Sequence, residues 1–516
     1  PDLRPSPPTP SPSHPAASRC RLPRVAPGVA VLCALLSASP PALAGEWERS
    51  ASLALGSIFS DNICLSDLDK KSETVGTVTP AVRISGQGGR ASAELDASIE
   101  YNSLGESDLR CEFGQGGQLG NRQTWAPRGR FLGSFDAIDG WLRLEADALA
   151  AQNAINPFAP GDGDNLNGRG NTNITYQYGA SAILERLLPD SLLLNARYRY
   201  LEQYNDFNLL GDSTQNQLSA YFGRDPRASR LALGVAGNYN EISFEESPQG
   251  PAFDNELSSV ELRGNLQLSR SFSLDTRVGR EDNVFLSNSG DVDGDFWDFG
   301  VRWSPNTRIE VTAGTGERFF GETPRFSASY RHKRSALRVE YAISVTFPQN
   351  VRVDDGNLFD DELLPPSVPG SPLPVDGTPT FIGQGAIKRE DFRLQYRFQA
   401  RRTSFSLRAG ESDQTLFLTG GQARFRNIDG AATRRLGRRL SVDLAVGWSD
   451  NQGGGGATGF FLGDVERLRA TLGVSRTLGN STELVLRYSY TDQSSALVVN
   501  DFAENRFTIS LRHDFR

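Results

Sequence analysis

The chain has 516 residues, of which 38% are hydrophobic and 22% charged, with 52 glycines and a formal net charge of −8 at pH 7. This composition is too polar for a bundle of membrane-spanning helices, and the mild negative charge argues against a nucleic-acid partner. The length suits either three ordinary domains or one unusually large one.

The first 44 residues are predicted to be an upstream segment followed by a secretory signal peptide. Residues 1–18 are rich in Pro and Ser and carry no fold information. Arginines within residues 19–24 precede the apolar run VAPGVAVLCALLSA, and small residues up to Ala44 suit signal-peptidase cleavage. A short transmembrane anchor is the alternative, but about 14 apolar residues broken by Pro and Gly are too few to span a bilayer. We therefore expect export, with cleavage near Ala44.

The rest of the chain, residues 45–516, repeats a single pattern in which apolar and polar residues alternate along segments of about ten residues. This is the pattern of a strand with one apolar and one polar face, and ten residues suffice for a tilted strand to cross a membrane. The segments include Ser50–Phe59, RASAELDASIEY (90–101), SLLLNARYRY (191–200), SALRVEYAISVTF (335–347), EDFRLQYRF (390–398), RLSVDLAVGW (439–448), TELVLRYSY (482–490) and RFTISLRHDF (506–515). We count about 22 of them, with 18 to 24 compatible with the pattern.

Short and long connections between these segments alternate without a break. The short ones lie at 86–90, 137–140, 186–191, 224–229, 269–271, 304–307, 331–335, 399–402, 434–439 and 476–481, and the long ones at 60–73, 102–127, 152–172, 203–214, 241–256, 281–294, 316–324, 347–386, 410–421, 449–464 and 491–505. Short connections are mostly basic (RHKRS, RRLGRR) and long ones acidic (FEESP, DVDGD). The alternation predicts one antiparallel up-and-down transmembrane β-barrel with short periplasmic turns and long extracellular loops.

The polar faces are predicted to point into the barrel. An arginine aimed at the bilayer midplane costs about 2–4 kcal/mol, and a one-residue slip would turn Arg197 and Arg199 outward together. The same argument gives a set of candidate lumen-lining residues: Arg143, Arg197, Arg199, Arg263, Arg277, Arg302, Arg325, Arg338, Arg393, Arg397, Arg408, Arg469, Arg487 and Arg512, with Glu94, Asp96, Glu145, Asp147, Glu261, Asp275, Asp298, Glu310, Glu340, Asp391 and Asp443.

These charges have two interpretations. They could line a path for a polar or anionic solute, with arginines gripping carboxylate or phosphate groups, or they could pair across strands and stiffen the wall. A barrel of this size also needs its interior filled. The loop at 348–385 is the best candidate for an inward-folding plug, and a solvated surface loop, a separate partner or an open pore are the alternatives.

Four cysteines are present, and only Cys64 and Cys111 follow the predicted cleavage site. Both fall in long loops, hence on the same side, and an exported protein meets an oxidising environment, so they are candidates for one disulfide. The loop-entropy model assigns such a bond about 4 kcal/mol of stabilisation. Two unpaired thiols are the alternative.

An enzymatic, metal or cofactor site is not indicated. The three histidines, His14, His332 and His513, stand in no arrangement that suggests a hydrolase. The stretches DVDGD (291–295) and GDGDN (161–165) resemble fragments of calcium loops but lack the distal bidentate Glu, so solvated acidic loops are the default.

The chain resembles the outer-membrane β-barrel proteins associated with PEP-CTERM/exosortase and exopolysaccharide systems of Gram-negative bacteria. The resemblance rests on FSDNI (59–63), TVTPAVRISGQGGR (77–90), REDNVF (280–285), WDFGVRWSPNTR (297–308), ERFFG (317–321) and RHKRSALRVEY (331–341). It covers nearly all of the mature chain, and its motifs are specific in combination. It implies an outer-membrane location and a role in exporting or assembling exopolysaccharide, without catalytic or binding residues to carry over.

The predicted function is therefore a polar lumen for polysaccharide or another anionic solute in the cell outer membrane. Outer-membrane lipid, polysaccharide and periplasmic export components are the expected partners, and nucleic acid is not. A general diffusion porin is the first alternative. A structural or adhesive barrel without an open pore is the second.

Overall fold

The structure, a computed structural model, describes residues 45–106, 111, 124–161, 166, 170–207, 211–246, 252–288, 290–347, 385–454 and 463–515. Its strands are β1 (Gly45–Ser60), β2 (Glu73–Gly88), β3 (Ala91–Asn102), β4 (Trp125–Ile138), β5 (Leu142–Asn153), β6 (Asn173–Leu188), β7 (Leu192–Asn205), β8 (Ser213–Arg224), β9 (Leu231–Phe244), β10 (Phe253–Ser269), β11 (Phe272–Val284), β12 (Gly294–Asn306), β13 (Ile309–Arg318), β14 (Gly321–Glu322), β15 (Arg325–His332), β16 (Ser335–Thr346), β17 (Ile387–Gln399), β18 (Thr403–Leu416), β19 (Gln422–Arg435), β20 (Leu440–Gly454), β21 (Val465–Thr477), β22 (Thr482–Ser495) and β23 (Phe502–Phe515). Short 3₁₀ turns occur at η1 (Ser103–Glu106), η2 (Pro189–Ser191) and η5 (Val498–Asn500).

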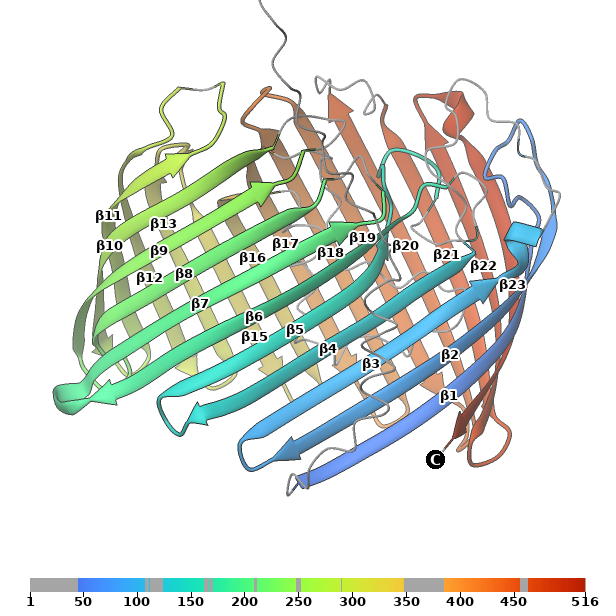
Figure 1. The fold of residues 1–516 in the computed structure, drawn as a ribbon, viewed down its shortest axis with the longest axis horizontal. Helices are drawn as coiled ribbons and strands as arrows, with labels where there is room; N and C mark the ends of the chain where they lie inside the picture. The colour runs from blue at the N-terminus through green and yellow to red at the C-terminus, as the bar shows by residue number, and fades with distance from the viewer. Residues whose placement is uncertain are drawn as a thin grey trace, which may run out of the picture. The chain divides into compact units, whose positions relative to one another are not determined.

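The strands form one closed barrel. Each pairs antiparallel with its chain neighbours, and β23 closes the ring on β1 with a register that runs from Ala51 opposite Phe515 to Ser60 opposite Arg506. The two-residue β14 pairs only with the end of β13, so 22 strands encircle the barrel (Figure 1). The predicted up-and-down barrel is confirmed, and closure leaves none of these 22 described strands with a free edge.

Short turns and long loops alternate around the ring as predicted, but the strands are longer than the segments of about ten residues inferred from alternation. β10, for example, has 17 residues and begins at Phe253, inside the predicted loop 241–256. The physical reason is that alternation marks only the part of a strand with one face in hydrocarbon. Beyond it both faces are wet, and pairing continues without an apolar signature.

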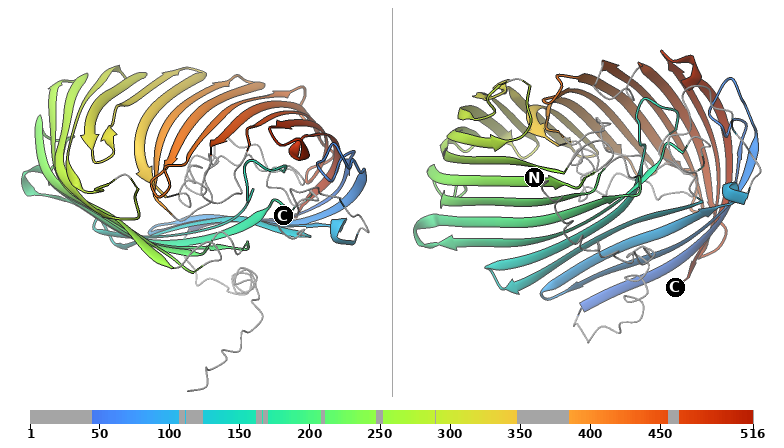
Figure 2. Two further views of the ribbon diagram at one scale, coloured as in Figure 1. Left: turned by 90° about the horizontal axis from the view of Figure 1, so that it is seen from above. Right: turned by 45° about the horizontal axis from the view of Figure 1, so that its top comes forward.

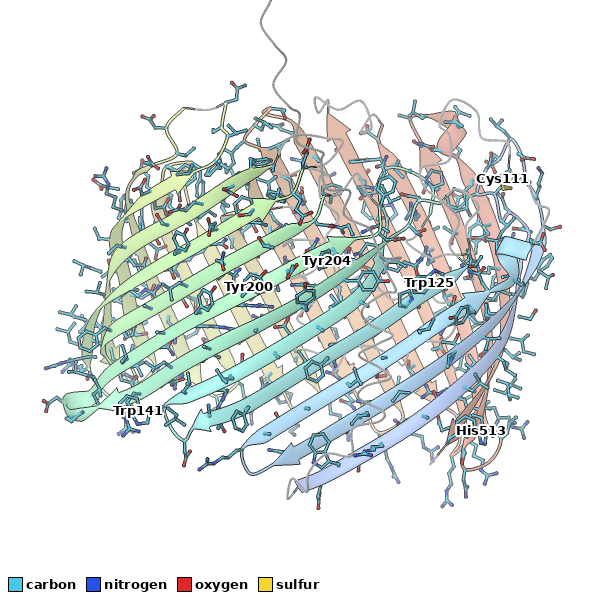
Figure 3. The ribbon with its side chains drawn as sticks, viewed as in Figure 1. Cys111, Trp125, Trp141, Tyr200, Tyr204 and His513 are labelled. Atoms are coloured by element: carbon cyan, nitrogen blue, oxygen red, sulfur yellow. A yellow bond between two sulfur atoms is a disulfide. The ribbon has the colours of Figure 1, made fainter. Side chains whose placement is uncertain are left out.

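The outer face carries large apolar side chains that no protein layer covers. Leu233, Val260 and Leu262 are 60%, 63% and 62% exposed. Aromatic residues border this band at both ends, with Trp125 toward the long loops and Trp141 beside a short turn (Figure 3). An apolar band between aromatic girdles is the surface of a barrel in lipid. No helix among the described residues is long and apolar enough to cross a membrane.

The predicted segment 1–44, with its cleavage site, lies outside the described residues, and residues Glu46–Arg516 form one compact unit.

Candidate functional site

The inner face of the barrel carries opposite charges that pair either across strands or two residues apart on one strand. The sequence-predicted residues Arg199 and Asp147 lie 3.1 Å apart, with side chains 18% and 15% exposed. Further pairs across strands are Arg197–Glu145 (3.5 Å), Arg277–Asp298 (3.3 Å), Arg302–Glu310 (3.9 Å), Arg143–Asp136 (3.1 Å), and Glu94 with Arg83 (3.2 Å) and Arg130 (3.8 Å). Pairs within one strand are Arg338–Glu340 (2.7 Å), Arg393–Asp391 (3.6 Å), Arg389–Asp391 (2.7 Å), Arg512–Asp514 (2.9 Å) and Arg263–Glu261. These contacts favour the interpretation in which the charges pair and stiffen the wall. They disfavour the alternative in which free arginines line a path for an anionic solute.

The remaining predicted residues are placed by strand register. Asp96 lies opposite Arg83 on β2 and Arg130 on β4. On the other wall, Arg408 lies opposite Asp429, Arg397 lies between Ala336 and Ser406, and both Arg469 and Arg487 lie opposite glycines. The charged residues are therefore spread around the inner wall rather than gathered in a single cluster, and we call them the charged belt.

Arg325 contacts two carboxylates of this belt. Its Nη2 lies 2.5 Å from Asp298 and 2.6 Å from Asp275, and its Nε donates a further hydrogen bond to Asp298 at 3.0 Å. Arg277 reaches Asp298 from the neighbouring strand. Two arginines thus share one carboxylate that is 7% exposed, and charge-assisted bonds of this kind are among the strongest available to side chains.

A segment that the sequence did not single out crosses the lumen. We call it the strap and define it as the described residues 154–161, Leu166 and residues 170–172 of the connection between β5 and β6. Figure 2 shows this teal connection reaching inside the ring toward the orange and red strands. Asn171 holds the two ends of the strap together, because its buried side chain accepts from the backbone N–H of Asn156 at 2.8 Å and donates to the carbonyl of Asn156 at 2.9 Å.

Phe158 docks the strap on the far wall. Its side chain is 2% exposed and packs in a cluster with Ile387, Phe425 and Val465, which come from β17, β19 and β21. Asn451 on β20 donates a hydrogen bond to the carbonyl of Pro157 at 3.0 Å. The strap therefore joins strands that are separated by about 300 residues in the chain.

Leu166 anchors the strap a second time, beside the disulfide. Cys64 and Cys111 are bonded, with their Cα atoms 5.6 Å apart. Leu166 is fully buried in a cluster with Ile58, Cys64 and Leu104, against which Cys111 also packs. Because this cluster belongs to the β1–β3 side of the barrel, the strap contacts both it and the β17–β21 side.

A phenylalanine cluster lies at the long-loop end of another part of the wall. Phe244, Phe347 and Phe417 are buried and packed with Phe285 and Phe319, so the cluster joins β9–β13 to β16–β18. The Phe285 and Phe417 rings are 5.2 Å apart. The strap and this cluster fill part of an interior that strand side chains alone cannot fill.

Neutral amides line the inner face of β6–β9 toward the long loops. We call Gln177, Gln203, Gln215, Gln217 and Asn240 the amide band, since they occupy paired or neighbouring inner positions. Gln215 donates to Asn240 at 2.6 Å. Gln177 and Gln215 are 6% and 2% exposed, yet the Oε1 atom of each has no hydrogen-bond partner among the described residues. Buried acceptors of this kind are costly unless something bonds to them.

The predicted plug, the loop at 348–385, lies outside the described residues except for Gly385. The strap and the amide band were not predicted. The isolated apolar residues of the strap, within a loop rich in Asn, Gly and Pro, are the sequence feature that could have indicated its inward fold.

The structure also gives the positions or contacts of the described residues in the calcium-like stretches and of two histidines. Asp293 accepts a hydrogen bond from the backbone of Asn283 at 2.6 Å, and His513 contacts Thr482 at 2.9 Å. His332 ends β15. Within the described part of the chain, no three acidic, His or Cys side chains are grouped closely enough to hold a metal ion. Asp162 and Asp164 lie outside it, as does His14.

Comparison with known proteins extends only to the fold. No protein-family model and no curated protein matches the chain. Among solved structures, the FrpB iron transporter from Neisseria meningitidis matches with a TM-score of 0.51 and 12% identity, over 92% of this chain and 83% of that one. The siderophore receptor PirA from Acinetobacter baumannii matches with a TM-score of 0.50 and 9% identity, over 91% of this chain and 80% of that one. The chain therefore shares the β-barrel fold of these two proteins.

Proposed function

We propose that this barrel resides in the outer membrane and conducts a hydroxyl-rich polymer, an exopolysaccharide, through its lumen. The amide band carries the proposal. Amide side chains both donate and accept hydrogen bonds and are uncharged, so they match neutral sugar hydroxyls. Gln217 and Asn240, which lie opposite each other on β8 and β9, are half-buried rather than buried, so their amides are the members of the band that such hydroxyls can reach.

The charged belt supports the same class of cargo. Many of its arginines are paired with carboxylates, as Arg199 is with Asp147 at 3.1 Å, and this pairing weakens the preference of the described inner wall for anions. The strap supports selective passage over general diffusion, because a segment docked on the far wall divides the lumen. The two structural neighbours are named as an iron transporter and a siderophore receptor, which agrees with a transport role for the fold.

The test is current block in planar bilayers. Neutral oligosaccharides added on the long-loop side should block the single-channel current of the purified barrel more strongly than anionic ones of the same length. Gln217→Leu and Asn240→Leu should each weaken the block about fivefold, since one hydrogen bond contributes about 1 kcal/mol. Gln267→Leu, an exposed inner-face residue near a short turn, is the matched control and should change nothing.

A deletion strain separates the alternatives. Loss of extracellular polysaccharide with unchanged uptake of small solutes supports the proposal, and the reverse supports a diffusion porin. A barrel that never conducts in bilayers, even with the strap released, would fit a structural or adhesive role and contradict any transport.

A further inference from the structure

The outer wall of the barrel is hollowed over β8–β11. A cavity of about 430 Å³ lies between Leu218, Ala220, Gly237, Tyr239, Val260 and Arg280. A second hollow of about 230 Å³ shares Ala220, Gly237 and Val260 with the first and continues toward Phe222 and Val235. The two form one groove on the side of the wall that carries the exposed apolar residues.

The groove arises from the strand register. Ala196, Ala220 and Gly237 occupy one cross-strand row on β7, β8 and β9. The rows on either side carry large side chains, namely Tyr198, Leu218 and Tyr239 toward the long loops and Leu194, Phe222 and Val235 toward the short turns. A row of small residues between two rows of large ones leaves a channel about one side chain deep, of a width that suits a hydrocarbon chain.

The row of Ala196, Ala220 and Gly237 continues across β10 to charged residues on β11 and β12. Gly237 lies opposite Val260, Val260 opposite Arg280, and Arg280 opposite Asp295. The side chains of Arg280 and Asp295 are 75% and 84% exposed and 3.9 Å apart. Asp282 is the next outward residue of β11, whereas Val278, the one before Arg280, is apolar and 55% exposed. Arg280 therefore lies at the border of the apolar band, at the depth of lipid headgroups.

We propose that this groove binds a glycerophospholipid with a zwitterionic phosphoethanolamine headgroup. One acyl chain lies along Ala220 and Gly237, the phosphate contacts the guanidinium of Arg280, and the ammonium lies against Asp282 and Asp295. One cation between two carboxylates carries a net negative charge, which repels an anionic headgroup but complements a headgroup that has both signs.

The test is native mass spectrometry of the detergent-purified barrel with equal amounts of phosphatidylethanolamine and phosphatidylglycerol of the same acyl composition. We expect the ethanolamine lipid to be retained at least tenfold better. Gly237→Leu should abolish this retention, since a Cβ at Gly237 would meet only the Ser259 carbonyl, at 3.8 Å, so that the new side chain fills the groove without a backbone clash. Gly430→Leu, on the outer face of β19 with a similarly open site, is the matched control.

Arg280→Gln provides a second variant in case the glycine substitution disturbs folding, because its exposed side chain can be replaced without repacking. It should lower retention of the ethanolamine lipid to the level of the glycerol lipid. Equal retention of both lipids by the unaltered barrel, stronger retention of a phosphorylated glycolipid such as lipid A, or undiminished retention by folded Gly237→Leu would each overturn the proposal.

Discussion

The guanidinium of Arg325 on β15 lies 2.6 Å from the carboxylate of Asp275 on β11, although two strands run between them. Gly300 and Gly314 make this possible, because they occupy the intervening positions of the same cross-strand row. A Cβ on Gly300 would lie 2.5 Å from Nη2 of Arg325. A shorter version of this arrangement, with one glycine between the two charges, is the row Asp443, Gly473, Arg487.

Replacing one of these glycines should therefore weaken the wall. Gly314→Val places a side chain where the Arg325 guanidinium lies and should cost about 1–3 kcal/mol, the usual effect of overpacking. The measurement is the free energy of unfolding in urea. The fraction of folded barrel is monitored by its heat-modifiable mobility in gels. Gly430→Val on the outer face, where a Cβ meets only a carbonyl oxygen at 3.9 Å, is the control. Equal stability of the two variants would contradict the spacer role.

Removing the shared carboxylate should change ion selectivity. Asp298→Asn leaves Arg277 and Arg325 without their common partner and adds net positive charge to the lumen. We expect the reversal potential in a salt gradient to shift toward anions and the free energy of unfolding to fall by about 1–3 kcal/mol. Asp254→Asn, exposed on the outer face, should shift neither quantity. An unchanged reversal potential would show that Asp298 does not face the conducting path.

Releasing the strap should open the lumen. Phe158→Ala removes a side chain that is 2% exposed, and comparable truncations cost about 3–5 kcal/mol. Since the loss falls on the docking contact rather than on the strand ladder, we expect higher and noisier single-channel conductance with little change in global stability. Phe135→Ala, an exposed outer-face residue, is the control. Conductance identical to that of the unaltered barrel would exclude the strap as a constriction.

Breaking the disulfide should loosen the other end of the strap. The bond joins residues 47 apart in sequence, and the loop-entropy model gives it about 4 kcal/mol. The Cys64→Ser and Cys111→Ser double variant should unfold at lower denaturant and lose protection of Leu166 in hydrogen exchange. The unaltered protein under reducing conditions should behave alike, and the double variant should no longer respond to reductant. If Leu166 stays protected in the double variant, the disulfide does not hold the strap in place.

Two adjacent residues test the membrane-facing side directly. Leu472→Arg on the outer face should destabilise the barrel in liposomes by about 2–4 kcal/mol. Thr471→Arg, one residue away on the inner face, should be tolerated, because it points into a polar lumen. Leu472 is 47% exposed with no protein layer over it. The contrast is measured by urea unfolding, and a reversed order would place the hydrocarbon on the other side of the wall.

The alternation of residues by itself determined the strands, their two faces and the order of short and long connections. The reason is physical and local. A strand with one face in lipid repeats every two residues, and a one-residue slip exposes every charge to hydrocarbon. That is why the register around Arg197 and Arg199 could be inferred, and why strand ends beyond the apolar band, such as the start of β10 at Phe253, could not.

The tertiary structure alone decided what occupies the lumen and what hollows the wall. Phe158 contacts Phe425 only because the strands close into a ring. Arg325 contacts Asp275 only because two glycines leave space between their strands. The groove at Gly237 likewise exists only when small residues from three strands align. These contacts join residues far apart in the chain, and a local pattern carries no information about which distant side chain completes them.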